Sequence, residues 1–396
     1  MSNSFLPYGR HQIDEDDIAA VVDVLKNGAL TCGPKLGEFE TAFAGAIGAA
    51  EAIVCSNGTT ALHLAAIAAG IAPGDKVVVP AVTFLSTANV VRMCGADVVF
   101  ADVDADTGLL TAETLEDAIT RAGGTVKAVM PVHLNGQCVD MPAVKAVADR
   151  VGAKIITDCC HALGARYHEG GRPGDGQYED FACFSLHPVK SIAMGEGGFV
   201  TTNDAAFARR IRQLRGHDME RDSERWQVAE QGFDREGNAN PWYYEMGELA
   251  YNYRATDMQC ALGLSQLRKL EGFVARRAQI ADLYDAAFQG FSNSLRPVPR
   301  TSLAASAWHL YPALIDFDAV GKERGQVMRE LQALGVGTQV HYLPVPWQPY
   351  YRDLYGEGDL PGAARYYGRV LSLPIYPAMS DADVARVVAA LREVLG

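Results

Sequence analysis

Between about residue 50 and residue 204, short apolar runs alternate with helical patterns, and this alternation restricts the possible folds most strongly. The apolar runs are EAIVCS, KVVVP, ADVVFADVD, KAVMPVHL, KIITDCCH and DFACFSLH. KVVVP and KIIT are apolar on both faces, as central strands are when helices cover both sides of a parallel sheet. Such alternation builds βαβ units. The sequence therefore predicts an α/β fold, with a three-layer large domain around a mostly parallel sheet.

A chain of 396 residues suggests a second, smaller domain. The long helical pattern RATDMQCALGLSQLRKLEGFVARRAQIADLYDAAF contains the expected boundary, so we predict a large domain over 1–270 and a small α+β domain over 271–396. WHLYPALIDF and VGTQVHYLP are its expected strands, and GKERGQVMRELQALG and DADVARVVAALREVL its expected helices. The first 25 residues are expected to pack with one of the lobes. The polar stretches 164–180 and 217–247 are expected to be surface loops.

Charge and hydropathy exclude several classes of protein. The net charge of −13 argues against nucleic-acid binding, which normally needs a basic face. No apolar run approaches the ~20 residues that cross a bilayer. The N-terminus MSNSFLPYGRHQIDEDD lacks the layout of a secretion signal. We therefore expect a cytoplasmic protein without membrane or nucleic-acid partners.

The cysteine spacing argues against a metal site. Eight cysteines occur, with no C-x-x-C pair among them. Several stand in apolar stretches, where a free cysteine behaves as a small hydrophobic residue. Buried thiols are thus expected rather than metal ligands.

One lysine stands between a buried run and a glycine-rich turn in FACFSLHPVKSIAMGEGGFVTT. Both flanks are predicted strands, and burying the amine of Lys190 costs desolvation energy. Burial also lowers the pKa of a lysine, which suits it to covalent chemistry with a carbonyl group. Taken alone, Lys190 is better interpreted as a surface lysine at a strand end than as a reactive amine.

Three upstream features favour the chemical interpretation. SNGTT, residues 56–60, joins a strand to a helix and offers backbone N–H groups suited to a phosphate, although an ordinary helix cap fits as well. Asp158 ends an apolar strand, where open α/β sheets bind ligands. Phe84 follows another strand and could cover a planar ring. His161 stands three residues after Asp158, and taken alone it is more commonly a buried core histidine than a functional one.

Phosphate turn, aromatic ring, aspartate and lysine together match pyridoxal 5'-phosphate (PLP). The cofactor has a phosphate for the turn, a ring for Phe84, a pyridine nitrogen for Asp158 and an aldehyde for Lys190. Asp158 would keep the ring nitrogen protonated, and Lys190 would bind the aldehyde and later move protons.

Longer motifs resemble a known family. SNGTTALHLA, PAVTF, VHLNGQ, DCCHALGA and FSLHPVKSIAMGEGGFVTTND resemble the DegT/StrS family of sugar-nucleotide aminotransferases, which are fold-type I PLP enzymes. The resemblance runs from PYGRHQIDEDDI to LSLPIYPAMSDADVARVV. HPVKSI, YEMGELAYNYRATDMQCALG and VHYLPVPWQPYY are most similar to the 4-aminotransferases of pseudaminic acid biosynthesis.

The resemblance implies a role for each matching residue. Lys190 matches the cofactor lysine, Asp158 the partner of the ring nitrogen, and His161 a residue beside the ring hydroxyl. The other cofactor-binding positions implied are Gly58, Thr59, Phe84, Ser185 and Asn252. Asn252 would reach the phosphate of the neighbouring subunit, which implies a homodimer with shared active sites. The expected substrate-binding residues are Tyr8, Gly33, His187 and His341, although the small-lobe aromatics fit dimer contacts equally.

The resemblance also implies a reaction. An amino group would pass from L-glutamate, through pyridoxamine phosphate (PMP), to C4 of a UDP-linked 4-keto-6-deoxy sugar. Transaminases of other nucleotide keto sugars, such as the GDP-perosamine type, remain alternatives. A related dehydratase, in which histidine replaces the lysine, and a non-catalytic relative are less favoured because Lys190 and Asp158 are both present. Cys159-Cys160 stands where the family often has alanine or serine, and we expect simple packing there.

Overall fold

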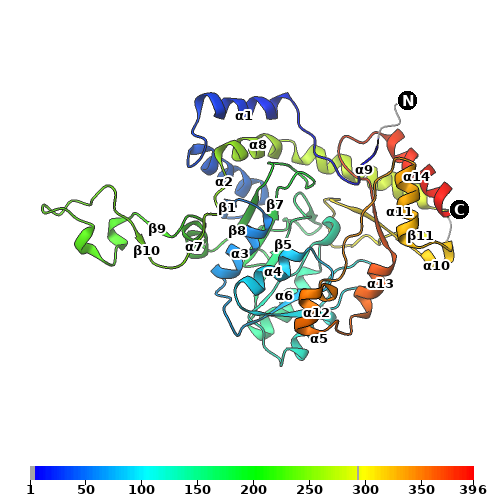
Figure 1. The fold of residues 1–396 in the computed structure, drawn as a ribbon, viewed down its shortest axis with the longest axis horizontal. Helices are drawn as coiled ribbons and strands as arrows, with labels where there is room; N and C mark the ends of the chain where they lie inside the picture. Colours follow the sequence, from blue (N-terminus) through cyan, green and yellow to red (C-terminus); the bar gives the residue numbers. More distant parts are fainter. Residues whose placement is uncertain (1–4, 292–293) are drawn as a thin grey trace.

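The computed structural model describes residues 5–291 and 294–396, and its centre is a seven-stranded sheet (Figure 1). The strand order is β1-β8-β7-β5-β4-β2-β3. The strands span β1 Glu51–Cys55, β2 Lys76–Pro80, β3 Asp97–Ala101, β4 Ala128–Val129, β5 Lys154–Asp158, β7 Phe181–Ser185 and β8 Gly198–Thr202. Only β8 runs antiparallel to its neighbours. The predicted α/β fold with a mostly parallel sheet is confirmed.

Helices cover both faces of this sheet. They are α2 Pro34–Ile47, α3 Gly58–Ala68, α4 Leu85–Met93, α5 Ala112–Arg121, α6 Met141–Val151, α7 Ala205–Arg215 and α8 Asp257–Leu267. On β1, Ala52 and Val54 join the apolar cluster that contains α2 and α8, whereas Ile53 and Cys55 join the cluster that contains α3 to α7. This two-sided burial explains why the central strands are apolar at every position.

A small sheet and its helices form the C-terminal region. The sheet has the order β11-β13-β14, with β11 Leu295–Pro297, β13 Tyr311–Ile315 and β14 Val370–Leu373. The helices are α9 Leu270–Phe288, α10 Phe317–Val320, α11 Arg324–Ala333, α12 Pro349–Tyr355, α13 Pro361–Arg369 and α14 Asp381–Leu395. Part of this region, including Val345 and Tyr366, packs into the core of the large sheet. The domain boundary near 270 stays a prediction.

The N-terminal segment touches both parts of the molecule. Leu6 forms a parallel bridge with Val336 and belongs to the apolar cluster of the C-terminal region. Helix α1, Glu15–Asn27, packs instead on α8. The segment from Leu6 to Asn27 therefore links the small lobe to the large one.

Two expected elements differ from the structure. VGTQVHYLP, residues 336–344, forms no strand and makes only isolated bridges, Leu6↔Val336 and Gln339↔Ser372. The side chains of residues 339–343 line a cavity, and the backbone of this segment does not continue a sheet edge. The long pattern 254–288 forms two helices, because the chain turns between α8 and α9 at Arg268 and Lys269.

Residues 217–247, called the arm below, project to one side of the molecule (Figure 1). The short strands β9, Met219–Glu220, and β10, Glu245–Met246, pair antiparallel at its base. The remaining short elements are β6 Arg166–Tyr167, β12 Ala304–Ala305, η1 Leu134–Gly136, η2 Ser223–Arg225, η3 Ala229–Gln231 and η4 Val345–Trp347. None of the helices in the described part of the chain is long and apolar enough to cross a membrane.

Candidate active site

A cavity of about 660 Å³ opens beside the carboxyl ends of β5 and β7 and gathers most of the predicted site residues. Ten of the twelve line it: Tyr8, Gly58, Thr59, Phe84, Asp158, His161, Ser185, His187, Lys190 and His341. The edge at the carboxyl ends of parallel strands is where open α/β sheets bind ligands. The roles of these residues stay predictions, but the structure brings them together.

Gly33 and Asn252 do not line this cavity. Gly33 precedes α2, and its N–H donates to Oδ2 of Asp257 over 2.8 Å. Asn252 is exposed and forms an isolated bridge with Gly216 at the base of the arm. Asn252 is therefore accessible to a second protein chain, and it does not belong to the cavity of its own chain.

Asp158 ends β5 and holds its carboxylate in a fixed orientation. The side chain is 5% exposed. Oδ2 accepts a hydrogen bond from Oγ1 of Thr87 over 2.7 Å, and Oδ1 accepts one from the N–H of Cys160 over 3.0 Å. Thr83 in turn lies 3.0 Å from the Thr87 hydroxyl. These two hydrogen bonds fix the orientation of the carboxylate at the edge of the cavity.

The turn before α3 presents a helix N-terminus to the cavity. Asn57 caps this helix, with its side chain accepting from the N–H of Thr60 over 2.9 Å. Thr59 Oγ1 lies 2.6 Å from Oγ of Ser86. A Cβ atom on Gly58 would stand 2.8 Å from the Cβ of Ser185, so the absence of a side chain keeps this corner open. Free N–H groups and hydroxyls at the positive end of a helix dipole form an anion site.

Lys190 lies in the loop between β7 and β8, and its side chain is half-buried. Burial lowers the pKa of its amine, and the nearby Cys160 and Asp158 oppose that shift. In the described part of the chain, the amine has no hydrogen-bond or ion-pair partner. A lysine with a depressed pKa and a free amine is suited to bond a carbonyl carbon.

His161 stands between the two lobes. Its Nδ1 accepts the N–H of Asn135 over 3.3 Å, and its Nε2 lies 3.3 Å from the Tyr342 hydroxyl. Its ring also lies 4.3 Å from that of His309, measured between centroids. Burial, with help from Lys190 and His341, lowers the pKa of His161 well below its usual range. The imidazole is therefore neutral at physiological pH.

Two other predicted residues come from outside the large domain. His341 is buried, its Nδ1 lies 2.8 Å from Oγ of Ser372, and burial lowers its pKa to about 3. The ring of Tyr8 lies 5.5 Å from that of His341. Both residues narrow the cavity on the side of the small lobe.

The structure also adds residues that sequence reasoning missed. Tyr342 lines the cavity beside His341, and Thr87 holds Asp158 from the first turns of α4. Thr87 stands three positions after Phe84 in PAVTFLST, so this spacing was an available signal in the sequence. No local pattern marks Tyr342, because its position depends on how the lobes meet.

Most of the cysteines are buried, as expected. Cys55, Cys138, Cys159, Cys183 and Cys260 are buried, Cys94 and Cys160 are partly exposed, and Cys32 is exposed. Burial raises the pKa of the Cys160 thiol well above its usual value. A protonated thiol is a poor nucleophile. Within residues 5–291 and 294–396, no three His, Cys, Asp or Glu side chains are grouped as a metal site.

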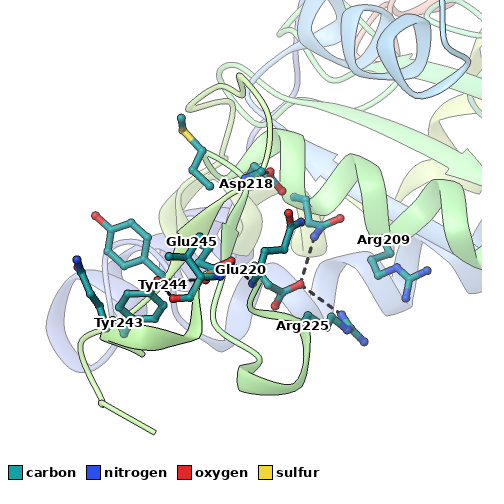
Figure 2. Close-up of a pocket in the computed structure, with 13 residues that line it drawn as sticks. Arg209, Asp218, Glu220, Arg225, Tyr243, Tyr244 and Glu245 are labelled. Atoms are coloured by element: carbon teal, nitrogen blue, oxygen red, sulfur yellow. Dashed lines mark hydrogen bonds and ion pairs between the residues drawn. The ribbon is translucent and has the colours of Figure 1, made fainter. Parts of the chain in front are cut away.

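A second hollow, of about 770 Å³, lies where the arm meets α7 (Figure 2). Its acidic groups already have partners. Glu245 accepts from the N–H groups of Gln227 and Val228, and Glu220 accepts from the side chain of Gln213. Figure 2 shows Arg225 facing Glu220 across this hollow. This hollow offers no set of reactive groups comparable with that of the cavity at Lys190.

The cavity at Lys190 fits pyridoxal phosphate on three structural grounds. A buried carboxylate, Asp158, faces into it from a strand end. An anion site lies beside Gly58 and Ser185, and a Cβ at position 58 would close that site. The amine of Lys190 is free for a carbonyl. These residues supply partners for the ring nitrogen, the phosphate and the aldehyde of that cofactor.

Comparison with known families agrees with this fit. The DegT/DnrJ/EryC1/StrS aminotransferase family matches residues 11–392. The chain therefore belongs to this family and is an enzyme of the PLP-dependent sugar aminotransferase class. Spore coat polysaccharide biosynthesis protein SpsC of Bacillus subtilis is 39% identical over 99% of this chain and 98% of its own length.

Solved structures share the whole fold. Helicobacter pylori PseC, an aminotransferase involved in the biosynthesis of pseudoaminic acid, matches with a TM-score of 0.88 and 26% identity over 99% of both chains. The putative sugar aminotransferase Spr1654 of Streptococcus pneumoniae has 27% identity in both its PMP-form and its PLP-form. Their TM-scores are 0.86 and 0.85, and the matches cover 98% of this chain and 97% and 98% of those chains.

Proposed function

We propose that this enzyme transfers an amino group from L-glutamate to C4 of a nucleotide-linked 4-keto-6-deoxy sugar. The first candidate is UDP-2-acetamido-2,6-dideoxy-β-L-arabino-hex-4-ulose. The observation that carries the proposal is the free amine of Lys190 in one cavity with the hydrogen-bonded carboxylate of Asp158. The likeness to PseC supports the sugar, and the family supports the reaction.

When bound, the cofactor supplies an electron sink for the carbon that loses a proton. In our proposal, Asp158 would pair with the ring nitrogen and keep it cationic, and the hydrogen bonds from Thr87 and from the Cys160 N–H hold the carboxylate in position. The α3 N-terminus and Ser185 bind the phosphate. Lys190 accepts the α-proton of glutamate and later donates a proton to the sugar carbon C4. Because the pKa of Lys190 is lowered, the same amine can accept the first proton and donate the second.

We further propose that the active enzyme is a homodimer whose subunits share each site. Lys190 is the only lysine or arginine among the described residues that line the cavity, and it is needed for the reaction. His161 and His341 are neutral because burial lowers the pKa of both. Beside the cofactor phosphate, the site must bind in turn the two carboxylates of glutamate and a nucleotide diphosphate, and each needs more positive charge. A second subunit is the natural source.

Residues near the base of the arm fit that contribution. Asn252 is exposed, and Arg254 makes no hydrogen bond or ion pair within residues 5–291 and 294–396. The neighbouring surface carries large exposed apolar side chains: Val228, Trp242, Tyr244, Met246 and Leu249. An apolar group of this kind beside unpartnered polar residues is typical of a protein interface. A second copy of the chain would cover it and would place Asn252 and Arg254 at its cavity.

The substrate is tested with a panel of keto sugars. Purified enzyme is mixed with L-glutamate and with UDP-, GDP- or dTDP-linked 4-keto sugars, and the amino sugar and 2-oxoglutarate are quantified by mass spectrometry. The UDP-linked 2-acetamido sugar is expected to react with the highest kcat/KM. A higher kcat/KM for a GDP-linked sugar would point to the perosamine type. Loss of a sugar hydroxyl without amine transfer would contradict the aminotransferase reaction.

A further inference from the structure

Tyr342 brings a phenol from the small lobe into the cavity. It lies in the segment between α11 and η4, next to His341. Its hydroxyl is 3.3 Å from Nε2 of His161, and its ring centroid is 6.0 Å from that of Phe84. The phenol therefore contacts two residues of the large domain, His161 and Phe84.

The environment of His161 fixes the direction of this hydrogen bond. Nδ1 accepts the N–H of Asn135, and a backbone N–H can only donate. The ring is neutral because burial lowers the pKa of His161 well below its usual range. A neutral imidazole has one hydrogen, which must then be on Nε2. Nε2 of His161 therefore donates, and the oxygen of Tyr342 accepts.

The hydrogen of the Tyr342 hydroxyl is left free by this arrangement. Within the described part of the chain, the hydroxyl has no hydrogen-bond partner other than His161. Burial raises the pKa of the phenol, so it stays protonated. The titratable groups around it are Asp158, Tyr8, Cys160 and Tyr366, together with His161. The free hydrogen is available to an acceptor inside the cavity.

The layout of the cavity shows which acceptor that is. In pyridoxal phosphate, the ring nitrogen is opposite the aldehyde carbon, and a ring oxygen and the phosphate arm stand on the two sides of that carbon. Asp158 and Lys190 mark the axis from nitrogen to aldehyde. Gly58 and Ser185 mark the phosphate side. With the cofactor placed in this way, one side of its ring is left, and the hydrogen-bonded pair His161 and Tyr342 in the cavity wall is assigned to it.

We propose that Tyr342 donates a hydrogen bond to the ring oxygen of bound pyridoxal phosphate. His161, which the family resemblance places beside this oxygen, acts on it through Tyr342, since its only hydrogen holds the phenol oxygen in place. This inference rests on the cofactor of the proposed function. It assigns a residue of the small lobe to the cofactor and makes the electronic state of the cofactor depend on how the lobes meet.

The test is a spectrophotometric pH titration of purified holoenzyme, comparing wild type with Tyr342→Phe. The ring oxygen shares a proton with the Lys190 nitrogen of the bound cofactor. When the donor is lost, the oxygen relies on that shared proton alone and holds it more tightly. The midpoint of the visible band is therefore expected to rise by about one to two pH units, since a hydrogen bond to a charged group is worth about 1.5–3 kcal/mol.

Two further variants make the result specific. Tyr8→Phe removes another hydroxyl of the same cavity and is expected to leave the midpoint where it is. His161→Gln keeps an N–H donor for the Tyr342 oxygen, whereas His161→Leu removes it. The midpoint is expected to move less in His161→Gln than in His161→Leu.

An unchanged midpoint in a cofactor-loaded Tyr342→Phe enzyme would overturn the proposal. So would an increase in the KM for the sugar with no change in midpoint, because the hydroxyl would then serve the substrate. If Tyr342→Phe is isolated without cofactor, circular dichroism checks the fold and equilibrium dialysis measures the Kd for added PLP. A folded variant with wild-type Kd counts against the proposal, and a raised Kd supports it. If wild type itself binds no PLP, the proposed function fails instead.

Discussion

Lys190 and Asp158 share one cavity, but their surroundings support them differently. Asp158 accepts hydrogen bonds from Thr87 and from the N–H of Cys160, which hold the orientation of its carboxylate. The amine of Lys190 has no such partner in the described part of the chain, and burial lowers its pKa. The carboxylate is thus held in one orientation, whereas the amine is free to exchange protons. This difference matches the two tasks that we propose.

Replacing Lys190 tests the reactive amine directly. Lys190→Ala is expected to lower kcat by more than about 10²-fold, because a positioned proton-transfer group contributes at least that much. The visible absorbance of the bound cofactor should also disappear. Lys190→Arg keeps the positive charge and is the matched control, and it should be inactive as well. Substantial turnover in Lys190→Ala would assign the chemistry to another group.

Replacing Asp158 or its partner Thr87 tests the role of the carboxylate. Asp158→Asn is expected to lower kcat roughly 10- to 100-fold, the equivalent of one charge-assisted hydrogen bond of about 1.5–3 kcal/mol. Cofactor affinity should fall less, because the phosphate turn is intact. Thr87→Val removes one donor and should give a smaller loss in the same direction. Steady-state kinetics and PLP titration measure both, and equal rates in all three proteins would make the carboxylate structural only.

At the scale of elements, the start of α3 lies against the end of β7. A Cβ on residue 58 would stand 2.8 Å from the Cβ of Ser185 and 3.3 Å from the sulfur of Cys160. Gly58→Ala should therefore push the phosphate turn away and weaken PLP binding by on the order of ten-fold or more, as lost charge-assisted bonds would. Gly45→Ala in α2 meets nothing within 4 Å and is the control, expected to bind PLP normally.

The turn after β4 depends on a neutral histidine. Nδ1 of His133 accepts the N–H of Val139 over 3.1 Å, and burial lowers the pKa of His133 to about 3. Below pH ~6.5, His133 therefore binds a proton in the unfolded chain but not in the folded chain. The free energy of unfolding is thus at its full value above that pH and falls as the pH drops toward 3. His133→Asn keeps an acceptor and removes the titration.

Urea unfolding at pH 7.5 and 5.5 measures this effect. The free energy of unfolding of wild type is expected to fall between these pH values by about 1 kcal/mol more than that of His133→Asn, close to the ~1.4 kcal/mol per pH unit of one proton. The other buried histidines are unchanged in both proteins, so their contribution cancels. Equal losses would mean that His133 is protonated in the folded state.

Elements buried on two faces could be predicted from the sequence, and those shaped by contacts between distant segments could not. KVVVP and KIITD form strands because both of their faces meet helices. VGTQVHYLP is also predicted as a strand, but this segment lines the cavity. There, the His341 side chain is hydrogen-bonded to Ser372. Lys190, Asp158 and Gly58 follow strands and could be placed for that reason. Tyr342 could not, because only the meeting of the lobes brings it to His161.

At the scale of the whole molecule, the shortage of positive charge in the cavity leads to a test of subunit sharing. Lys190→Ala and Asn252→Ala are each expected to be nearly inactive as pure proteins. If Asn252 serves the partner's cavity, a mixed dimer of the two variants has one intact site. Co-refolded equal amounts should regain about a quarter of wild-type activity, because half of the dimers are mixed and half of their sites are intact. No recovery in verified mixed dimers would place Asn252 outside the shared site.

The bridge between Leu6 and Val336 has a consequence for how the protein is made. Leu6 leaves the ribosome early, yet its partner in the small-lobe core is translated some three hundred residues later. At ~5–20 residues per second, the leading segment waits on the order of tens of seconds for its docking place. The nascent chain can complete the cavity at Lys190, which Tyr8 borders, only after the small lobe has been made, so a chain stalled before residue 336 keeps an unfinished cavity.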